Sequence, residues 1–305
     1  METPTGPALV DALRLTPRGA VDALEDALRS GFDPEDDPPR SRVATAAGEL
    51  LLMPSTLGDV SGVKLLSLTG DNPQRDLPVV QGAYLLFEGP GQRPAALVDG
   101  AALTDLRTSA VSALAVRHLL PRSDDRPLRL VVLGAGPQAR AHVTTLRTLH
   151  DLASVTLVGR APDTVAALAQ ELGAAVGDVS AVAEADVVCC CTSATTPLFD
   201  GDLVRDDAVV VAIGSHHPGA RETDDVLVRR SAVVVESRRS ALAEAGDVVL
   251  PIDAGVLDVA DLVTLREVVT GAVVLPEGRP RLFKGTGMSW QDLVVAAAEL
   301  HARRT

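Results

Sequence analysis

The sequence predicts an α/β protein that combines a Rossmann-type, doubly wound parallel sheet domain with an N-terminal α+β domain. Beyond Leu128, short apolar runs alternate with segments of helical periodicity, which is the pattern of parallel strands joined by helices. Two of the runs, VVCCCT and AVVVAI, are apolar throughout, as expected for strands that are covered on both faces. A glycine-rich turn, GAGPQA, separates the first strand of this part from the helix that follows it.

The part of the chain before about residue 120 has a different pattern. Residues 7–31 have helical character, with Thr16-Pro17 as a start signal and Gly31 as a stop signal. Thr104–Leu120 also carries apolar residues at helical spacing. Four shorter segments have the composition of β-strands: Gly48–Met53, Val60–Leu68, Val79–Phe87 and Ala95–Val98. We therefore expect a mixed sheet with helices here, and not βαβ repeats.

A polar segment bounded by prolines, Pro121–Pro127, separates the two patterns. Its composition is typical of a domain boundary. We therefore assign 1–121 to a substrate-binding and dimerisation domain and 122–287 to a Rossmann domain. Residues 288–305 form an amphipathic helix that is able to close either domain, and we expect it to return to the first.

The composition narrows the possible partners. The formal net charge of −13 disfavours binding to nucleic acids and to anionic membranes, which requires a basic surface. No apolar run is long enough for a transmembrane helix, and the first residues lack the pattern of a signal peptide. The three cysteines, Cys189, Cys190 and Cys191, are consecutive and cannot provide a disulfide framework. We expect a cytoplasmic protein.

Lysine is rare in this chain. Of the 28 lysines and arginines only Lys64 and Lys284 are lysines, so ordinary positive positions are filled by arginine. A lysine in such a sequence is therefore more often required for its ammonium group than a lysine in an average sequence.

The turn Gly134-Ala135-Gly136-Pro137-Gln138-Ala139 fits the G-x-G-x-x-A form of the dinucleotide fingerprint. Gly134 allows the tight turn, Gly136 allows the pyrophosphate to approach the backbone, and Ala139 keeps the helix close to the strand. The turn lies between a strand and a helix, as the fingerprint requires. It predicts a nicotinamide dinucleotide cofactor.

The residues after the second Rossmann strand indicate which cofactor is preferred. An NAD enzyme usually has an acidic residue there to bind the ribose, but this chain has Gly159 and Arg160. A guanidinium can pair with the 2′-phosphate of NADP, which an acid would repel. We expect NADP to be preferred over NAD; the alternative is that Arg160 is only a solvated loop residue.

A series of short motifs resembles the ornithine cyclodeaminase/μ-crystallin family from about residue 40 to the C-terminus. The motifs occur in the family's order: Arg42, Met53-Pro54, Gly62-Val63-Lys64, Asn72-Pro73, Leu106-Arg107-Thr108-Ser109-Ala110, GAGPQA, Ile213-Gly214-Ser215 and Phe283-Lys284-Gly285-Thr286-Gly287. No single motif is specific, but the ordered set is.

The resemblance implies a substrate pocket that faces the nicotinamide and is lined by Arg42, Lys64 and Arg107. Two guanidiniums suit the carboxylate of an imino or amino acid. A lysine buried beside arginines has a depressed pKa and is a candidate acid/base. The alternatives are that Lys64 is an exposed lysine on a strand, that Arg107 is an ordinary cation on a helix, and that Arg42 is a cation in a loop.

The resemblance also implies further contacts with the cofactor. The residues concerned are Gln81, Thr108, Thr192, Ser193, Gly214, Ser215, Lys284 and Gly287. For Lys284, a lysine at the entry to a helix is the competing interpretation.

The loop 213–219 departs from the cyclodeaminases of the family, which carry an aspartate where this chain has His216. Histidine can act as an acid or base near neutral pH, so we include His216 as a candidate catalytic residue, but it supplies no fixed negative charge. A polar loop without catalytic function is the alternative. Metal binding by His216 and His217 is not expected, because neighbouring side chains diverge and no acidic residues follow at chelating spacing.

Together these observations favour an NAD(P)H-dependent oxidoreductase that acts on the C=N or CH–NH bond of a small imino or amino acid, as a ketimine reductase or an amino-acid dehydrogenase does. The first alternative is a cyclodeaminase-like ammonia lyase. The second is a protein that binds NADPH and a carboxylate ligand without turnover. The resemblance also implies a homodimer.

Overall fold

The computed structural model describes residues 8–121 and 126–304, and the chain divides into two compact units. The first unit consists of Met1–Thr108 and Met288–Thr305, and the second of Ser109–Gly287. The division falls inside helix α2 (Gly100–Leu119) and not in the polar segment after it, part of which lies outside the described residues. The second half of α2 is bonded to the second unit, because Ser109 and Ser112 form hydrogen bonds with Thr145 and His142.

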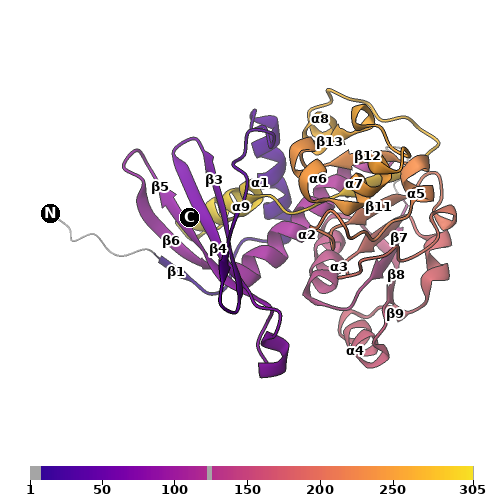
Figure 1. The fold of residues 1–305 in the computed structure, drawn as a ribbon, viewed down its shortest axis with the longest axis horizontal. Helices are drawn as coiled ribbons and strands as arrows, with labels where there is room; N and C mark the ends of the chain where they lie inside the picture. The colour runs from indigo at the N-terminus through magenta and orange to yellow at the C-terminus, as the bar shows by residue number, and fades with distance from the viewer. Residues whose placement is uncertain (1–7, 122–125, 305) are drawn as a thin grey trace. The chain divides into compact units, whose positions relative to one another are not determined.

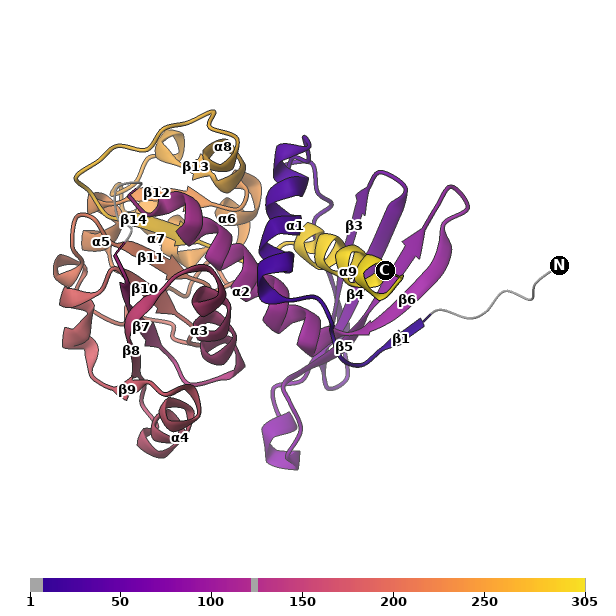
Figure 2. The same cartoon turned by 180° about the vertical axis from the view of Figure 1, so that it is seen from behind.

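The first unit is built on a mixed six-stranded sheet with the order β1-β6-β5-β4-β3-β2, antiparallel except for the parallel pair of β1 and β6. The strands are β1 Ala8–Val10, β2 Ser41–Thr45, β3 Gly48–Leu57, β4 Val60–Leu68, β5 Val80–Glu88 and β6 Arg93–Asp99. Helices α1 (Pro17–Arg29) and α9 (Ser289–Arg304) complete it, together with a 3₁₀ turn at Asn72–Arg75. In Figures 1 and 2, α9 lies along one face of the sheet and α1 lies beside α9.

The N-terminal helix is shorter than the sequence suggests, and residues 7–31 are not all helical. The helix begins at Pro17 because the Thr16 side chain accepts a hydrogen bond from the Gly19 amide and caps it. Before it, Ala8–Val10 pairs with β6 and forms an edge strand. Strand β2, which carries Arg42, is also absent from the prediction; all five of its residues are exposed, so no alternation marks it.

The second unit contains a parallel eight-stranded sheet with the order β13-β12-β14-β11-β10-β7-β8-β9, which confirms the predicted Rossmann-type fold. The strands are β7 Leu128–Leu133, β8 Leu152–Val158, β9 Ala175–Val176, β10 Val187–Cys190, β11 Val209–Ala212, β12 Ala232–Val235, β13 Val263–Thr264 and β14 Arg281–Lys284. The helices are α3 Pro137–Leu149, α4 Pro162–Leu172, α5 Asp225–Arg230, α6 Arg238–Glu244, α7 Gly246–Asp253 and α8 Leu265–Val269, with 3₁₀ turns at Val179–Glu184, Gly201–Leu203 and Val259–Asp261. Every residue of β10, β11, β12 and β14 is buried.

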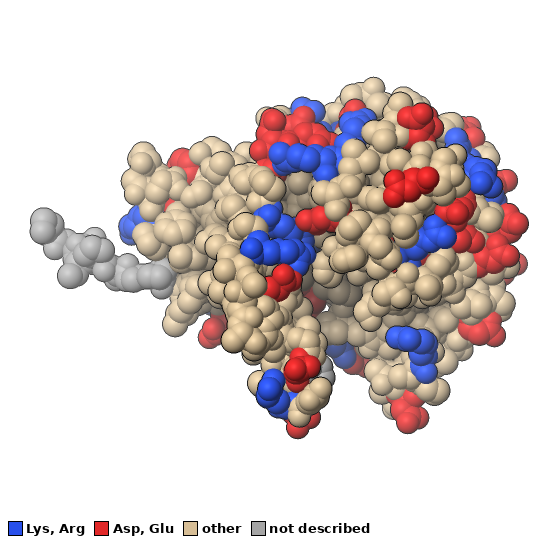
Figure 3. Space-filling view, in the orientation of Figure 1, with Lys and Arg blue, Asp and Glu red and all other residues tan. Residues whose placement is uncertain are grey.

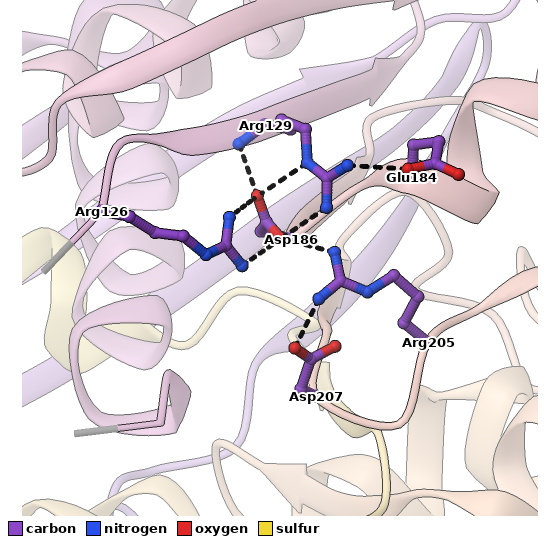
Figure 4. A network of polar contacts seen from close by, with 6 residues as sticks. All are labelled: Arg126, Arg129, Glu184, Asp186, Arg205 and Asp207. Atoms are coloured by element: carbon purple, nitrogen blue, oxygen red, sulfur yellow. Dashed lines mark hydrogen bonds and ion pairs between the residues drawn. The ribbon is translucent and has the colours of Figure 1, made fainter. Parts of the chain in front are cut away.

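A charged cluster ties the amino ends of β7 and β10 together (Figure 4). The Asp186 carboxylate accepts hydrogen bonds from the side chains of Arg126, Arg129 and Arg205 and from the Arg129 amide. Burial alone would raise the pKa of Asp186, but the hydrogen bonds from Arg126 and Arg129 outweigh it and hold the pKa well below its usual range. This cluster lies at the end of the strands opposite to their carboxyl ends.

Acidic and basic side chains are interspersed on the face that Figure 3 shows, without a continuous basic patch among its coloured residues. Within residues 8–121 and 126–304, no helix is both long and apolar enough to cross a membrane.

Candidate functional site

The second unit has a cavity of about 730 Å³ at the carboxyl ends of β7, β8 and β10. The sheet order reverses between β8, which follows β7 in the chain, and β10, which lies on its other side. Parallel α/β sheets bind ligands at such a switch point. Of the predicted cofactor residues, six line the cavity: Gly134, Gly136, Gly159, Arg160, Thr192 and Ser193.

The glycine-rich turn has the geometry that a pyrophosphate requires. Gly134 has φ of +122°, and a Cβ there would overlap the Cys191 carbonyl oxygen, so only glycine fits. A Cβ at Gly136 would meet no atom within 4 Å apart from its chain neighbours, so the backbone there is open to a ligand. Gly136 caps α3 without a side-chain hydrogen bond, and Pro137 occupies the first turn. The first amides of α3 are therefore free of a side-chain cap and suit an anion.

In the loop after β8, the rim of the cavity carries an arginine, Arg160, that is available to bind an anion. Arg160 is exposed, lines the cavity and forms no ion pair within the described part of the chain. By contrast, Arg140 on α3 is engaged by Glu171 through two hydrogen bonds of 2.7 Å. A Cβ at Gly159 would lie 2.8 Å from Val165, so this position has no room for the acidic side chain typical of NAD enzymes.

A buried carboxylate supports the wall of the cavity. Glu222 has no exposed surface and accepts hydrogen bonds from the amide and hydroxyl of Thr192 and from the Gly214 amide, at 2.7–3.0 Å. Burial raises the pKa of Glu222 to about 7, although the positive charge of Lys284 opposes the shift. Ser215 is also buried, and its hydroxyl donates to the Ala220 carbonyl. Gly214 and Ser215 thus belong to the support of the cavity and do not line it.

The remaining predicted cofactor residues of this unit are packed inside it. Lys284 is the last residue of β14, is 1% exposed and has its Nζ 2.9 Å from Asp247 Oδ2. Ala139 is buried in α3, and the Gln138 carbonyl accepts a hydrogen bond from the His142 ring. Gly287 donates its amide to Glu236. These residues, like Pro137, are not among those that line the cavity.

Burial disfavours the thiolate form of all three cysteines. Burial raises the pKa of Cys189 to about 12 and raises the pKa of Cys190 and Cys191 well above the usual value. Cys191 also lines the cavity, where it acts as a small apolar residue.

In the first unit, Lys64 points to the face of the sheet that α9 covers. Its cross-strand neighbours are Met53 on β3 and Tyr84 on β5, and all three side chains are buried. Lys64 itself has no exposed surface. A Cβ at Gly62 would overlap the Tyr84 hydroxyl, so glycine in the Gly62-Val63-Lys64 motif makes room for this tyrosine.

Lys64 and Arg107 share one carboxylate, that of Asp292 on α9. Asp292 Oδ1 lies 2.9 Å from Lys64 Nζ and 3.3 Å from Arg107 Nε. Gln291, the preceding residue, accepts a hydrogen bond of 3.0 Å from Arg107 Nη1. Burial lowers the pKa of Lys64 from 10.5 to about 8, with Asp292 opposing the shift and Arg107 adding to it. The cluster therefore holds two cations and one anion in a site with almost no exposure.

Three other predicted residues of this unit lie outside that cluster: Arg42, Gln81 and Thr108. Arg42 stands opposite Leu51 in the sheet and so shares the face of Lys64, but it is exposed and paired with Glu49. Gln81 is exposed near the start of β5, on the opposite face from Tyr84. Thr108 is buried in α2, and its hydroxyl has no hydrogen-bond partner among the described residues.

His216 lies in an exposed stretch, His216–Gly219, after β11. In the same loop, His217 Nδ1 accepts a hydrogen bond from the Gly219 amide.

The sequence-based prediction does not include the carboxylates that organise these residues: Asp292, Glu222 and Asp247. Asp247 and Asp292 each stand directly before an apolar run, in GDVVLP and SWQDLVVAAA, and an acid beside an apolar run is the signal available for them. Glu222 lies in the polar stretch RETDD, which gives no such signal. The residue that a buried acid pairs with is not visible in the sequence.

Comparison with known proteins links this arrangement to enzymes of imino acids. A profile of the ornithine cyclodeaminase/mu-crystallin family matches residues 10–301. A Delta(1)-pyrroline-2-carboxylate reductase of Colwellia psychrerythraea is 34% identical over 289 residues, which is 88% of this chain and 90% of that protein. The ketimine reductase mu-crystallin of Rattus norvegicus is 34% identical over 83% of this chain and 80% of its own.

Solved structures of two reductases are also similar. The Delta(1)-pyrroline-2-carboxylate reductase of Thermococcus litoralis, in complex with NADH and L-proline, superposes with a TM-score of 0.86 at 26% identity and covers 96% of both chains. The iminosuccinate reductase of Paracoccus denitrificans, in complex with NAD⁺, has a TM-score of 0.86 at 26% identity and covers 98% of this chain and 97% of its own.

Proposed function

Because the chain belongs to the ornithine cyclodeaminase/μ-crystallin family, we propose that it is an NAD(P)H-dependent reductase of small imino acids. The observation that carries the proposal is the fully buried Lys64 next to Arg107, with only one carboxylate between them. Two buried cations beside one anion leave a site that favours a further anion, and the carboxylate of an imino acid is such a group. The relatives named for reduction of Delta(1)-pyrroline-2-carboxylate point to a cyclic imine with a carboxylate.

The residues at the carboxyl ends of β7, β8 and β10 would hold the cofactor. The open backbone at Gly136, the uncapped start of α3 and the 730 Å³ cavity fit a dinucleotide. The nicotinamide group supplies hydride for reduction of the imine carbon.

In the first unit, Arg107 would bind the substrate carboxylate. Arg42, which lies on the same sheet face as Lys64, would provide a second guanidinium. The Lys64 ammonium would donate a proton to the imine nitrogen, so that hydride and proton together convert the C=N bond into CH–NH. With a pKa near 8, Lys64 is largely protonated at neutral pH and can serve as this acid.

Reduction is favoured over cyclodeamination because of the loop after β11. His216 is exposed there, at the position where the cyclodeaminases of the family carry an aspartate. An imidazole does not provide the fixed negative charge that assists attack on an imine intermediate.

The test is to mix the purified protein with NADPH and Delta(1)-pyrroline-2-carboxylate and to follow the nicotinamide absorbance. Stoichiometric oxidation of NADPH with formation of proline supports the proposal. Release of ammonia from ornithine without net change in the cofactor would identify a lyase instead. Tight binding of NADPH with neither reaction would identify a binding protein.

We further propose that NADPH is preferred over NADH, since Arg160 is an unengaged guanidinium at the rim of the cavity. Arg160→Ala should weaken NADPH binding by about 1.5–3 kcal/mol, the range for hydrogen bonds to charged groups, and leave NADH binding nearly unchanged. Quenching of protein fluorescence or calorimetry measures both affinities. Arg140→Ala is the control, because Arg140 is already paired with Glu171 and does not line the cavity. Equal affinities of the parent protein for the two cofactors would contradict the proposal.

A homodimer is the proposed assembly, formed through the sheet face that α9 does not cover. Four apolar side chains on this face are exposed: Leu9, Val43, Leu65 and Leu97, at 37–70%. The strand register places them on one face, across the whole width of the sheet. Because this face is continuous and apolar, a second copy can cover it with the same residues. Leu65→Glu should turn a dimer into a monomer in light scattering after gel filtration; a monomeric parent protein would refute the proposal.

We also propose a cytoplasmic location. All three cysteines are free, and two of them are buried in the core of the Rossmann sheet, as suits a reducing compartment.

A further inference from the structure

The C-terminal helix places a carboxylate against the proposed acid of the reaction. Asp292 is in the first turn of α9, which packs on β3, β4 and β5 of the first unit (Figure 2). It lies 228 positions from Lys64 in the sequence, and neither side chain has any exposed surface. The closing segment of the chain thus completes the surroundings of Lys64.

One oxygen of Asp292 bridges the two cations. Oδ1 accepts a hydrogen bond of 2.9 Å from Lys64 Nζ and is 3.3 Å from Arg107 Nε. Gln291 holds the other end of the Arg107 guanidinium. Asp292 Oδ2 is buried and has no hydrogen-bond partner among the described residues. This bridge holds the ammonium between β4 and α9.

The charges around Lys64 shift its pKa in opposite directions. Burial disfavours its ammonium, and Arg107 and Arg40 add repulsion. Asp292 favours the ammonium through its charge and through its hydrogen bond with Lys64. Asp37, also buried, acts on the neighbouring Tyr84. Tyr84, across the strand, stays neutral because burial raises its pKa. Loss of the Asp292 charge would therefore leave a buried ammonium beside two guanidiniums.

We propose that Asp292 is a positioning residue for the reduction: it orients the Lys64 ammonium and keeps it protonated at neutral pH. This inference rests on the proposed function, in which Lys64 donates a proton to the imine nitrogen. It adds to that function a residue that does not touch the substrate and whose effect depends on pH.

The protonation state of Lys64 can be measured without any reaction. With lysine labelled with ¹³C at Cε, the chain gives only two lysine side-chain resonances, and the Lys64 signal is the one lost in Lys64→Arg. Asp292→Asn should move the titration midpoint of Lys64 down by about 1–3 pH units, the usual effect of one close opposite charge. Asp292→Glu keeps the charge and should leave the midpoint near that of the parent. An unchanged midpoint in Asp292→Asn overturns the proposal.

Glu299→Gln is a matched control on the same helix. Glu299 is 1% exposed, but its carboxylate binds the amides of Arg14 and Leu15 and the side chain of Arg303, not Lys64. This variant removes a buried charge from α9 and should not move the Lys64 midpoint. An equal shift in Glu299→Gln and Asp292→Asn would mean that a general disturbance of α9 is responsible, and would also overturn the proposal. If Asp292→Asn does not fold, Asp292→Ser gives the same comparison.

Kinetics supply the second readout. Near pH 8 the Asp292→Asn enzyme should reduce the imine about tenfold more slowly than the parent or worse, because its Lys64 is mostly neutral. The deficit should shrink as the pH is lowered and Lys64 regains its proton. A loss of kcat that is equal at all pH values would indicate a structural effect and overturn the proposal. If the parent protein reduces no imine but the midpoint still moves in Asp292→Asn, the proposed function fails while the electrostatic role of Asp292 stands.

Discussion

Replacing Lys64 with arginine should lower kcat for imine reduction by about 10²–10⁴, the usual range for loss of a general acid. Arginine keeps the positive charge near Asp292, but it remains protonated at any working pH and cannot give up a proton. Lys64→Ala should lose a similar factor. The measurement is single-turnover oxidation of NADPH at saturating imino acid.

The pH profile separates an acid from an anchor. The pKa of Lys64 is lowered from 10.5 to about 8, so the ammonium is present below that pH and lost above it. Reduction by the parent should therefore slow as the pH rises through about 8, and this limb should disappear in both variants. Both should still bind NADPH like the parent, since the residues that line the cavity lie in the second unit. A Lys64→Arg enzyme with parent-like kcat and an unchanged profile would refute the role as an acid.

The second large effect is expected at Arg107. Arg107→Ala should reduce kcat/KM by about 3–5 kcal/mol in transition-state free energy, the cost of breaking a buried pair, because it leaves Asp292 and the substrate carboxylate with one cation fewer. Arg42 is exposed and already paired with Glu49, so Arg42→Ala should cost less, about 1.5–3 kcal/mol. The effect should appear mainly in KM, with NADPH affinity nearly unchanged.

Arg93→Ala is the control for these two variants. Arg93 is an exposed arginine on β6 that pairs with Glu88 at the surface, and its loss should leave kcat/KM as in the parent. If both Arg107→Ala and Arg42→Ala keep the parent kcat/KM, neither residue binds the substrate carboxylate.

The sequence predicted the elements whose pattern is local. Strand β4 has the bounds predicted from the sequence, Val60–Leu68, because its apolar and polar residues alternate. Strand β14 was not predicted: its four residues are buried, but Arg281 and Lys284 interrupt the apolar run, and the strand forms only by insertion between β11 and β12. Such a strand is defined by its neighbours and not by its own composition.

The same limit applies to the site. The place of the fingerprint glycines at a turn between a strand and a helix could be predicted from the sequence, because such a turn is defined by residues a few positions apart. The burial of Lys64 was expected only from the family resemblance, because it depends on α9, and its partner Asp292 is at the other end of the chain. The family motifs named Lys64 and Arg107 but gave no reason for them to be adjacent to one carboxylate. That reason is the return of residues 288–305 to the first unit.

Both lysines are buried, so cleavage of the chain after a lysine reports that the protein has unfolded locally or globally. A protease specific for lysine has only two sites in the chain, and both side chains lie in the interior, at 0% and 1% exposure. Cleavage after Lys64 reports that the first unit has opened, and cleavage after Lys284 reports that the second has opened, since each site belongs to one unit. The fragment pattern therefore distinguishes the stabilities of the two units in one experiment, without any label. Trypsin does not offer this, because its many arginine sites are spread through both units.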